Sequence, residues 1–345
     1  MVADVADLQR RARELLPGPV YDYYAGGSGR ERTLRGNEKA WRHTWLAPRI
    51  LRNVAAVDTS IRLPGGSAAA PVCVAPTAYH GLAHPDGELA TAAGAARAGA
   101  LYVLSTRSSR RIEDVAAVVA AEGGSWWFQV YVLRDRSLTA DLVRRAAAAG
   151  AGALVLTADT PVVGRKRRSG RGEELVAADD FLVNLGPVAD LGRAALAADV
   201  TVADISWLTA AGGGLPVIVK GVLRPDDALA CAAAGAAGVI VSNHGGRQLD
   251  GAITTARALP GVAAAARVCA VYADGGIRSG ADVLAALALG AEAVFVGRPV
   301  LWALATGGAA GVQALLAELA DDLAHSMALA GAASVAEIAG IAAAG

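Results

Sequence analysis

The chain has 345 residues, of which 54% are hydrophobic and 19% charged, a composition typical of a globular protein with a large core. Its 32 basic residues balance 32 acidic ones, so no global field attracts a polyanion, and we expect no nucleic-acid partner. Apolar runs are interrupted by Gly, Asp or Arg before the roughly 18 residues that cross a bilayer, so we expect no membrane partner either.

The first 70 residues precede the first predicted strand. They begin with an amphipathic, charged stretch, which predicts no signal peptide. We expect residues 1–70 to form an N-terminal helical extension with a short irregular or hairpin portion. The three cysteines at 73, 231 and 269 stand apart in apolar surroundings, which predicts reduced thiols in a cytoplasmic protein.

Eight short apolar runs then alternate with Ala-rich segments of helical composition. GELATAAGAARAGA (87–100) and SGADVLAALALG (279–290) are two such helices, and several end in glycine just before the next strand. The predicted strands span residues 72–75, 101–105, 126–132, 153–159, 216–220, 238–243, 268–274 and 293–297.

Strands that are apolar throughout and separated by helices predict a parallel sheet covered on both faces. Eight such units over about 230 residues match an α/β fold of the (β/α)8 TIM barrel type. The competing fold, an open doubly wound sheet, requires a G-x-G-x-x-G turn after its first strand, and VAPTAYHG contains none. We therefore predict one barrel domain over residues 1–345. The unusually long connection at 160–203, after the fourth strand, predicts an active-site lid or a disordered loop.

Polar side chains follow the predicted barrel strands, at the end where such barrels build their active sites. Because the predicted strands form a closed barrel, these residues would form a ring around its open end: Pro76, Thr77, Ala78, Ser105, Gln129, Tyr131, Thr157, Asp159, Lys220, Ser242, Asn243, His244, Asp274, Gly275, Gly276, Gly297 and Arg298. A ring as wide as the barrel suits a large polar cofactor better than a small metabolite.

The loops after the last two strands predict a phosphate site. Such a site usually combines backbone N–H groups that glycines leave accessible, a helix N-terminus and an arginine. These two loops contain glycines, a predicted helix start, and Arg278 and Arg298. The five histidines are scattered, and no pair has the spacing of metal ligands, so we predict no metal site.

The segment SNHGGRQLD at 242–250 resembles the active-site signature of the FMN-dependent α-hydroxy acid oxidase and dehydrogenase family, which includes glycolate, lactate and mandelate oxidising enzymes. VYDYYAGGS, APTAYHGLAHPDGE, FQVYVLRDR, LTADTPVVGR, VKGV and DGGIRSGADVLAALALGA recur in family order. The resemblance extends from about residue 20 to about residue 330. It implies FMN as cofactor, a 2-hydroxy acid as substrate and a homotetramer as assembly.

The resemblance also implies roles for individual residues. His244 would be the base that takes a proton, with Asp159 supporting its charged form. Arg247 would bind the substrate carboxylate, and Tyr23 and Tyr131 would donate hydrogen bonds to the substrate. The residues do not distinguish removal of a carbon proton from hydride transfer. The cofactor would be held by Pro76, Thr77, Ala78, Ser105, Gln129, Thr157, Lys220, Ser242, Asp274, Gly275, Gly276, Arg278, Gly297 and Arg298.

Several positions depart from the family pattern. Lys166 stands where a second carboxylate-binding arginine is usual, so its charge lacks the planar fork of a guanidinium. Arg107 replaces a bulky apolar residue, and Tyr79-His80 replaces a frequent Met-Gln, which predicts a pocket for a larger, aromatic or additionally polar acid. Ala78 resembles the oxygen-using members.

We therefore predict an (S)-2-hydroxy acid oxidase in which electrons pass from reduced FMN to oxygen or another acceptor. Two alternatives remain at this stage. One is a dehydrogenase of the same family with a non-oxygen acceptor. The other is a phosphate-binding barrel with a non-redox or regulatory role.

Overall fold

In the computed structural model, eight parallel strands close into a barrel, which confirms the predicted fold class. The structure describes residues 4–168, 175, 183–185 and 192–342. Each strand pairs with the next along the chain, and the last pairs with the first. The barrel strands are β3 (Val72–Val74), β4 (Tyr102–Ser105), β5 (Trp126–Val130), β6 (Leu154–Thr157), β7 (Val217–Val222), β8 (Gly238–Val241), β9 (Ala270–Asp274) and β10 (Ala293–Val296).

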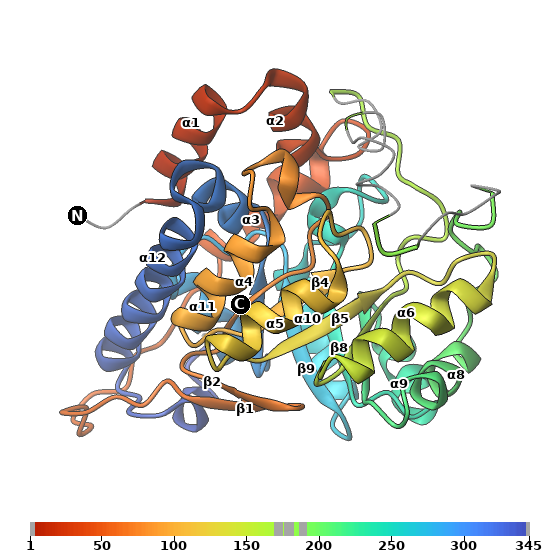
Figure 1. Cartoon of the computed structure of the whole chain (residues 1–345). Helices are drawn as coiled ribbons and strands as arrows, with labels where there is room; N and C mark the ends of the chain where they lie inside the picture. Colours follow the sequence, from red (N-terminus) through yellow and green to blue (C-terminus); the bar gives the residue numbers. More distant parts are fainter. Residues whose placement is uncertain (1–3, 169–174, 176–182, 186–191, 343–345) are drawn as a thin grey trace.

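Helices surround this barrel because each strand is apolar on both sides (Figure 1). The outward side chains of the strands pack against the helices in one large core. The helices that follow the strands are α4 (Glu88–Arg97), α5 (Ile112–Ala121), α6 (Arg136–Ala148), α8 (Ala203–Ala211), α9 (Pro225–Ala233), α10 (Thr255–Ala265), α11 (Gly280–Ala288) and α12 (Arg298–Ala330).

Inward side chains fill the barrel as a second core. Trp127, Tyr272 and Phe295 meet there with ring centroids 5.8 Å apart, and all three are almost fully buried. An antiparallel hairpin of β1 (Ile61–Leu63) and β2 (Gly66–Ala68) lies next to these rings. The Trp127 indole N–H donates a hydrogen bond to the Pro64 carbonyl in the turn of this hairpin (2.8 Å). The hairpin closes the N-terminal end of the barrel, so the cavity lies at the opposite end.

Three helices precede the hairpin: α1 (Val5–Leu15), α2 (Gly18–Ala25) and α3 (Arg32–Arg42). Figure 1 places α1 and α2 at the end of the molecule opposite β1 and β2. Helix α3 is fixed to the loop after β8 by an amide pair, in which Asn37 and Asn243 each donate to the other at 2.8 Å. The N-terminal helices thus cover the end of the barrel where the strands terminate.

Helix α12 is long and apolar enough to cross a membrane by length and composition alone. Half of its most apolar window is buried inside the protein, and the helix packs against α4, α1 and α11. At Gly308 the backbone leaves the helical region (φ 55°, ψ −142°), which kinks the helix. We interpret α12 as a core helix, whose continuous apolar character the sequence analysis did not predict.

Candidate active site

A cavity of ≈ 1190 Å³ opens at the carboxyl ends of the barrel strands. It exceeds the usual size of a small-ligand pocket and is large enough for a cofactor together with a substrate. Most of the predicted site residues line this cavity: Tyr23, Pro76, Thr77, Ala78, Tyr79, Ser105, Arg107, Gln129, Tyr131, Thr157, Lys166, Lys220, His244, Arg247, Asp274, Gly275, Gly276, Arg278, Gly297 and Arg298. The structure thus brings together side chains from all eight strand ends and from α2.

His244 and Asp159 form the centre of the arrangement. His244 Nδ1 lies 2.9 Å from Asp159 Oδ1, and Thr160 Oγ1 donates to the same carboxylate oxygen at 3.0 Å. Asp159 does not line the cavity but stands behind the imidazole. Burial alone would raise the pKa of Asp159, but the charges of His244 and Lys220 outweigh it and lower that pKa. The carboxylate is therefore ionised and stabilises positive charge on the histidine.

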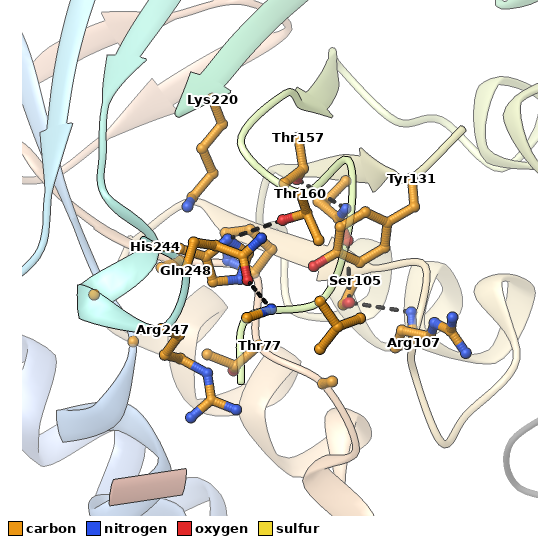
Figure 2. Close-up of a pocket in the computed structure, with 18 of the residues that line it drawn as sticks. Thr77, Ser105, Arg107, Tyr131, Thr157, Thr160, Lys220, His244, Arg247 and Gln248 are labelled. Atoms are coloured by element: carbon orange, nitrogen blue, oxygen red, sulfur yellow. Dashed lines mark hydrogen bonds between the residues drawn. The ribbon is translucent and has the colours of Figure 1, made fainter. Parts of the chain in front are cut away.

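The backbone directs this histidine into the cavity. His244 has a left-handed conformation (φ 58°), which is strained for a residue with a side chain. Its N–H donates to Ser242 Oγ at 3.0 Å, and the glycine that follows has φ 59°. Figure 2 shows the Lys220 ammonium and the Tyr131 hydroxyl pointing toward the same region as His244.

Lys220 is a buried cation held by two groups. Its Nζ donates to Ser242 Oγ at 2.9 Å and lies 3.0 Å from Asp274 Oδ2. Burial opposes its charge, but Asp274 and Asp159 more than compensate and raise the pKa of Lys220. Ser242 also lies outside the cavity lining and acts by connecting Lys220 to the backbone of His244. Burial, with the Asp159 charge, raises the pKa of Tyr131 to about 12, so its hydroxyl stays protonated as a donor.

Arg247 and Arg298 both donate hydrogen bonds to backbone carbonyls at the carboxyl end of α2. Arg247 Nη1 donates to the carbonyls of Tyr23 (2.7 Å) and Gly26 (3.0 Å), and its guanidinium lies over the Tyr23 ring at 5.1 Å. Arg298 donates to the carbonyls of Tyr24, Gly26 and Gly245, each at 3.0 Å. These bonds use Nη1 of Arg247 alone, and no described residue bonds its Nε or Nη2, so these donors can serve a ligand.

A polar network joins the ends of three adjacent strands. Gln129 Oε1 accepts from Ser105 Oγ at 3.1 Å, and Gln129 Nε2 donates to Thr157 Oγ1 at 3.0 Å. Because the three residues fix one another, this wall of the cavity presents a rigid set of hydrogen-bonding atoms.

The structure fits FMN at two places. Arg298 is partly buried beside Arg247 and Arg278, and the loss of hydration, together with their charges, lowers its pKa to about 9. A phosphate would relieve that repulsion. In addition, Asp274 Oδ1 is buried and has no hydrogen-bond partner among the described residues, which suits a ligand hydroxyl. Residues 275 and 276 are glycines with φ 83° and 92°, so the backbone itself faces the cavity there.

Some site residues escaped the sequence analysis. Gln248 donates to the carbonyls of Asp159 (2.8 Å) and Val162 (3.0 Å) and accepts from Gly164 N–H (3.0 Å), so it attaches the connection after β6 to the His244 loop. Thr160, directly after Asp159, also lines the cavity. The only feature of the sequence that could have identified Thr160 as a site residue is its position next to the candidate carboxylate Asp159. Part of the predicted lid at 160–203, residues 169–174, 176–182 and 186–191, lies outside the described residues; of the rest, residues 160–166, 194–196 and 198 line the cavity.

Comparisons with known proteins agree with this site. The chain is 46% identical to 4-hydroxymandelate oxidase of Amycolatopsis orientalis, an alignment that covers 96% of this chain and 95% of the relative. It is 42% identical to L-lactate oxidase of Nostoc sp., over 96% of this chain and 95% of the relative. A crystal structure of mandelate oxidase superimposes with a TM-score of 0.89 at 45% identity and covers 98% of this chain and 97% of that one.

The FMN-dependent dehydrogenase family matches residues 12–342, nearly the whole chain. The motifs on which the sequence resemblance depended lie around one cavity, and the match extends over all eight strands of the barrel. The chain is therefore a member of the FMN-dependent dehydrogenase family, with FMN as its cofactor.

Proposed function

We propose that this protein oxidises an (S)-2-hydroxy acid with a large, aromatic side chain to the 2-oxo acid and passes the electrons to oxygen. The single observation that carries the proposal is the His244–Asp159 pair at 2.9 Å, opening onto a cavity that also holds Lys220 and Arg247. FMN, when bound, supplies the two-electron acceptor. All other roles belong to side chains of the chain.

In this proposal His244 takes one of the two protons that the substrate loses. Asp159 stabilises the resulting imidazolium, because an ionised carboxylate at hydrogen-bond distance favours the charged form. Lys220 supplies a fixed positive charge where negative charge develops during reduction of the cofactor. The protonated Tyr131 hydroxyl donates a hydrogen bond to the substrate.

Arg247 and Lys166 bind the substrate carboxylate. Arg247 offers the planar donors and is already oriented by the carbonyls at the end of α2. Lys166 lines the cavity from the connection after β6, and its backbone pairs with that of Ser28. A lysine at this point adds charge without a second fork, so we expect a carboxylate grip that depends chiefly on Arg247.

Three observations support a large aromatic substrate. The rings of Tyr23 and Tyr79 lie 6.3 Å apart and both line the cavity. Leu196, with Ala194, Ala195 and Ala198, adds apolar surface to the cavity lining. The relatives include a protein named 4-hydroxymandelate oxidase, and one similar crystal structure is of mandelate oxidase with (S)-4-hydroxymandelic acid. Oxygen as acceptor is supported by Ala78 and by the relatives' names as oxidases.

Anaerobic mixing of the FMN-loaded protein with both enantiomers of mandelate, 4-hydroxymandelate, lactate and glycolate tests this proposal. We expect the flavin absorption to bleach fastest with an (S)-mandelate, followed by oxygen consumption and hydrogen peroxide release on aeration. Faster bleaching by glycolate would refute the aromatic preference. A reduced flavin that persists in air would favour the alternative, a dehydrogenase with another acceptor.

We also propose a cytoplasmic homotetramer. Trp45, Ile50 and Leu51 are 75%, 81% and 99% exposed, and a second copy of the chain would cover such an apolar segment. The three cysteines are free thiols, as in a reducing compartment. Light scattering tests the assembly: we expect four times the chain mass of 34.6 kDa, and a Trp45→Ser variant should dissociate.

A further inference from the structure

A second histidine lies directly behind the cavity. His80 is completely buried in the 3-10 turn η1 (His80–Leu82), between the end of β3 and helix α4. Its backbone N–H donates to Glu88 Oε1 at 3.0 Å, and Ser109 donates to both oxygens of the same carboxylate. The turn is therefore rigidly attached to α4, and the imidazole has a fixed position.

Each nitrogen of the His80 ring meets a threonine hydroxyl. Nε2 lies 2.5 Å from Thr77 Oγ1, and Nδ1 lies 2.8 Å from Thr91 Oγ1. Of these two threonines only Thr77 lines the cavity. Burial lowers the pKa of His80 despite the opposing charge of Glu88, so the ring is neutral. A neutral imidazole has one donor and one acceptor nitrogen, so one hydroxyl must donate to it and the other must accept.

The distances select which threonine donates. The Thr91 hydroxyl can donate either to His80 Nδ1 at 2.8 Å or to the Gly87 carbonyl at 3.5 Å. The second distance is too long for a normal O–H···O bond. Thr91 therefore donates to Nδ1, which places the ring proton on Nε2. The Nε2–H then donates to Thr77 Oγ1, and the hydroxyl hydrogen of Thr77 is left to point into the cavity.

We propose that His80 is a positioning residue that makes the Thr77 hydroxyl a hydrogen-bond donor toward the bound flavin. The inference rests on the proposed function only in taking FMN as the occupant of the cavity. A donor directed at a group that gains electron density stabilises its reduced form. His80 thereby raises the redox potential of the cofactor without touching it. This role is separate from those of His244, Asp159, Lys220 and Tyr131 described above.

The ring proton can be located directly. Long-range ¹H–¹⁵N spectra of the labelled protein distinguish the two neutral tautomers, and the His80→Gln variant identifies the His80 signals by their disappearance. We expect the proton on Nε2. A proton on Nδ1, or a doubly protonated ring at pH 7, would overturn the proposal. This measurement requires neither flavin nor substrate.

The redox potential of FMN in the holoenzyme is the second readout, measured by equilibration with a reference dye. For His80→Leu we expect the equilibrium ratio of reduced to oxidised flavin to fall about tenfold, which is about 30 mV for a two-electron couple. His80→Gln should retain most of the potential, because an amide can also donate to Thr77. The matched control is Ser109→Ala, which removes the Ser109 Oγ bond to Glu88 but keeps both backbone N–H bonds that attach the turn to this carboxylate, and should therefore shift the potential far less than His80→Leu.

Equal shifts in His80→Leu and Ser109→Ala would refute the proposal in favour of a general structural role, as would no shift in His80→Leu. The dye equilibration needs no hydroxy acid, so it succeeds or fails independently of the substrate assay. A protein that binds FMN but is reduced by no 2-hydroxy acid would contradict the proposed function and leave the His80 result interpretable.

Discussion

Replacing Asp159 by Asn tests the central electrostatic argument. The substitution preserves the shape of the side chain but removes the charge 2.9 Å from His244 Nδ1. Both side chains are largely buried, with exposed fractions of 12% and 23%. Two unit charges about 4 Å apart interact by about 4 kcal/mol at an effective dielectric constant of about 20. The asparagine oxygen retains part of the hydrogen bond, so we expect the imidazolium to lose about 2–4 kcal/mol of stabilisation.

This loss corresponds to a flavin reduction rate that is lower by about 30- to 1000-fold. The assay is anaerobic stopped-flow reduction of the FMN-loaded protein at saturating substrate. Affinity for FMN should change little, because Asp159 does not line the cavity. The matched control is Thr160→Val, which removes a neutral hydrogen bond to the same carboxylate and should slow reduction less than about tenfold. An Asp159→Asn rate within threefold of wild type, or a larger effect of Thr160→Val, would refute the reasoning.

Three further predictions concern the cofactor end of the cavity and the stability of the fold. Arg298→Ala should weaken FMN binding about 10- to 100-fold in a fluorescence titration, because a charge-assisted contact is lost; unchanged affinity would place the phosphate elsewhere. Lys220→Met should lower the free energy of unfolding of the FMN-free protein by about 3–5 kcal/mol, since it leaves Asp274 buried and uncompensated, and adding Asp274→Asn should recover part of the loss. Gly276→Ala should destabilise the protein more than Gly150→Ala in urea: both have positive φ, but only at position 276 would a Cβ meet backbone of α3, at 2.7 Å. Equal effects of the two glycine substitutions would contradict this contact.

The strands and their polar ends could be predicted because both signals are local. A run such as Val239–Val241 is apolar throughout, and the change to Ser-Asn-His marks where it leaves the barrel. The boundaries were less accurate. Tyr131 and Asp159 were placed within predicted strands, whereas the ladders end at Val130 and Thr157. Tyr131 nonetheless lines the cavity, and Asp159 reaches His244 from behind it.

Long-range contacts could not be predicted from local pattern. Asn37 and Asn243 are 206 residues apart, and neither stands in a sequence that demands a partner amide. The hydrogen bonds from Arg298 to the end of α2 could not be predicted either. An arginine after a strand suggests a phosphate-binding residue, and nothing in the local sequence indicates that it also donates to backbone carbonyls. Family resemblance supplied a role for Arg298, whereas the contacts of all three residues became visible only in the folded chain.

The grip of Arg247 and Arg298 on the carboxyl end of α2 also bears on the order in which the molecule assembles. The two arginines follow Tyr24 by 223 and 274 residues. During synthesis, α2 leaves the ribosome before either arginine, so these bonds to its carboxyl end form only after most of the barrel has been translated. The carboxyl end of α2 therefore completes its hydrogen bonds late, although α2 itself is translated before every strand of the barrel.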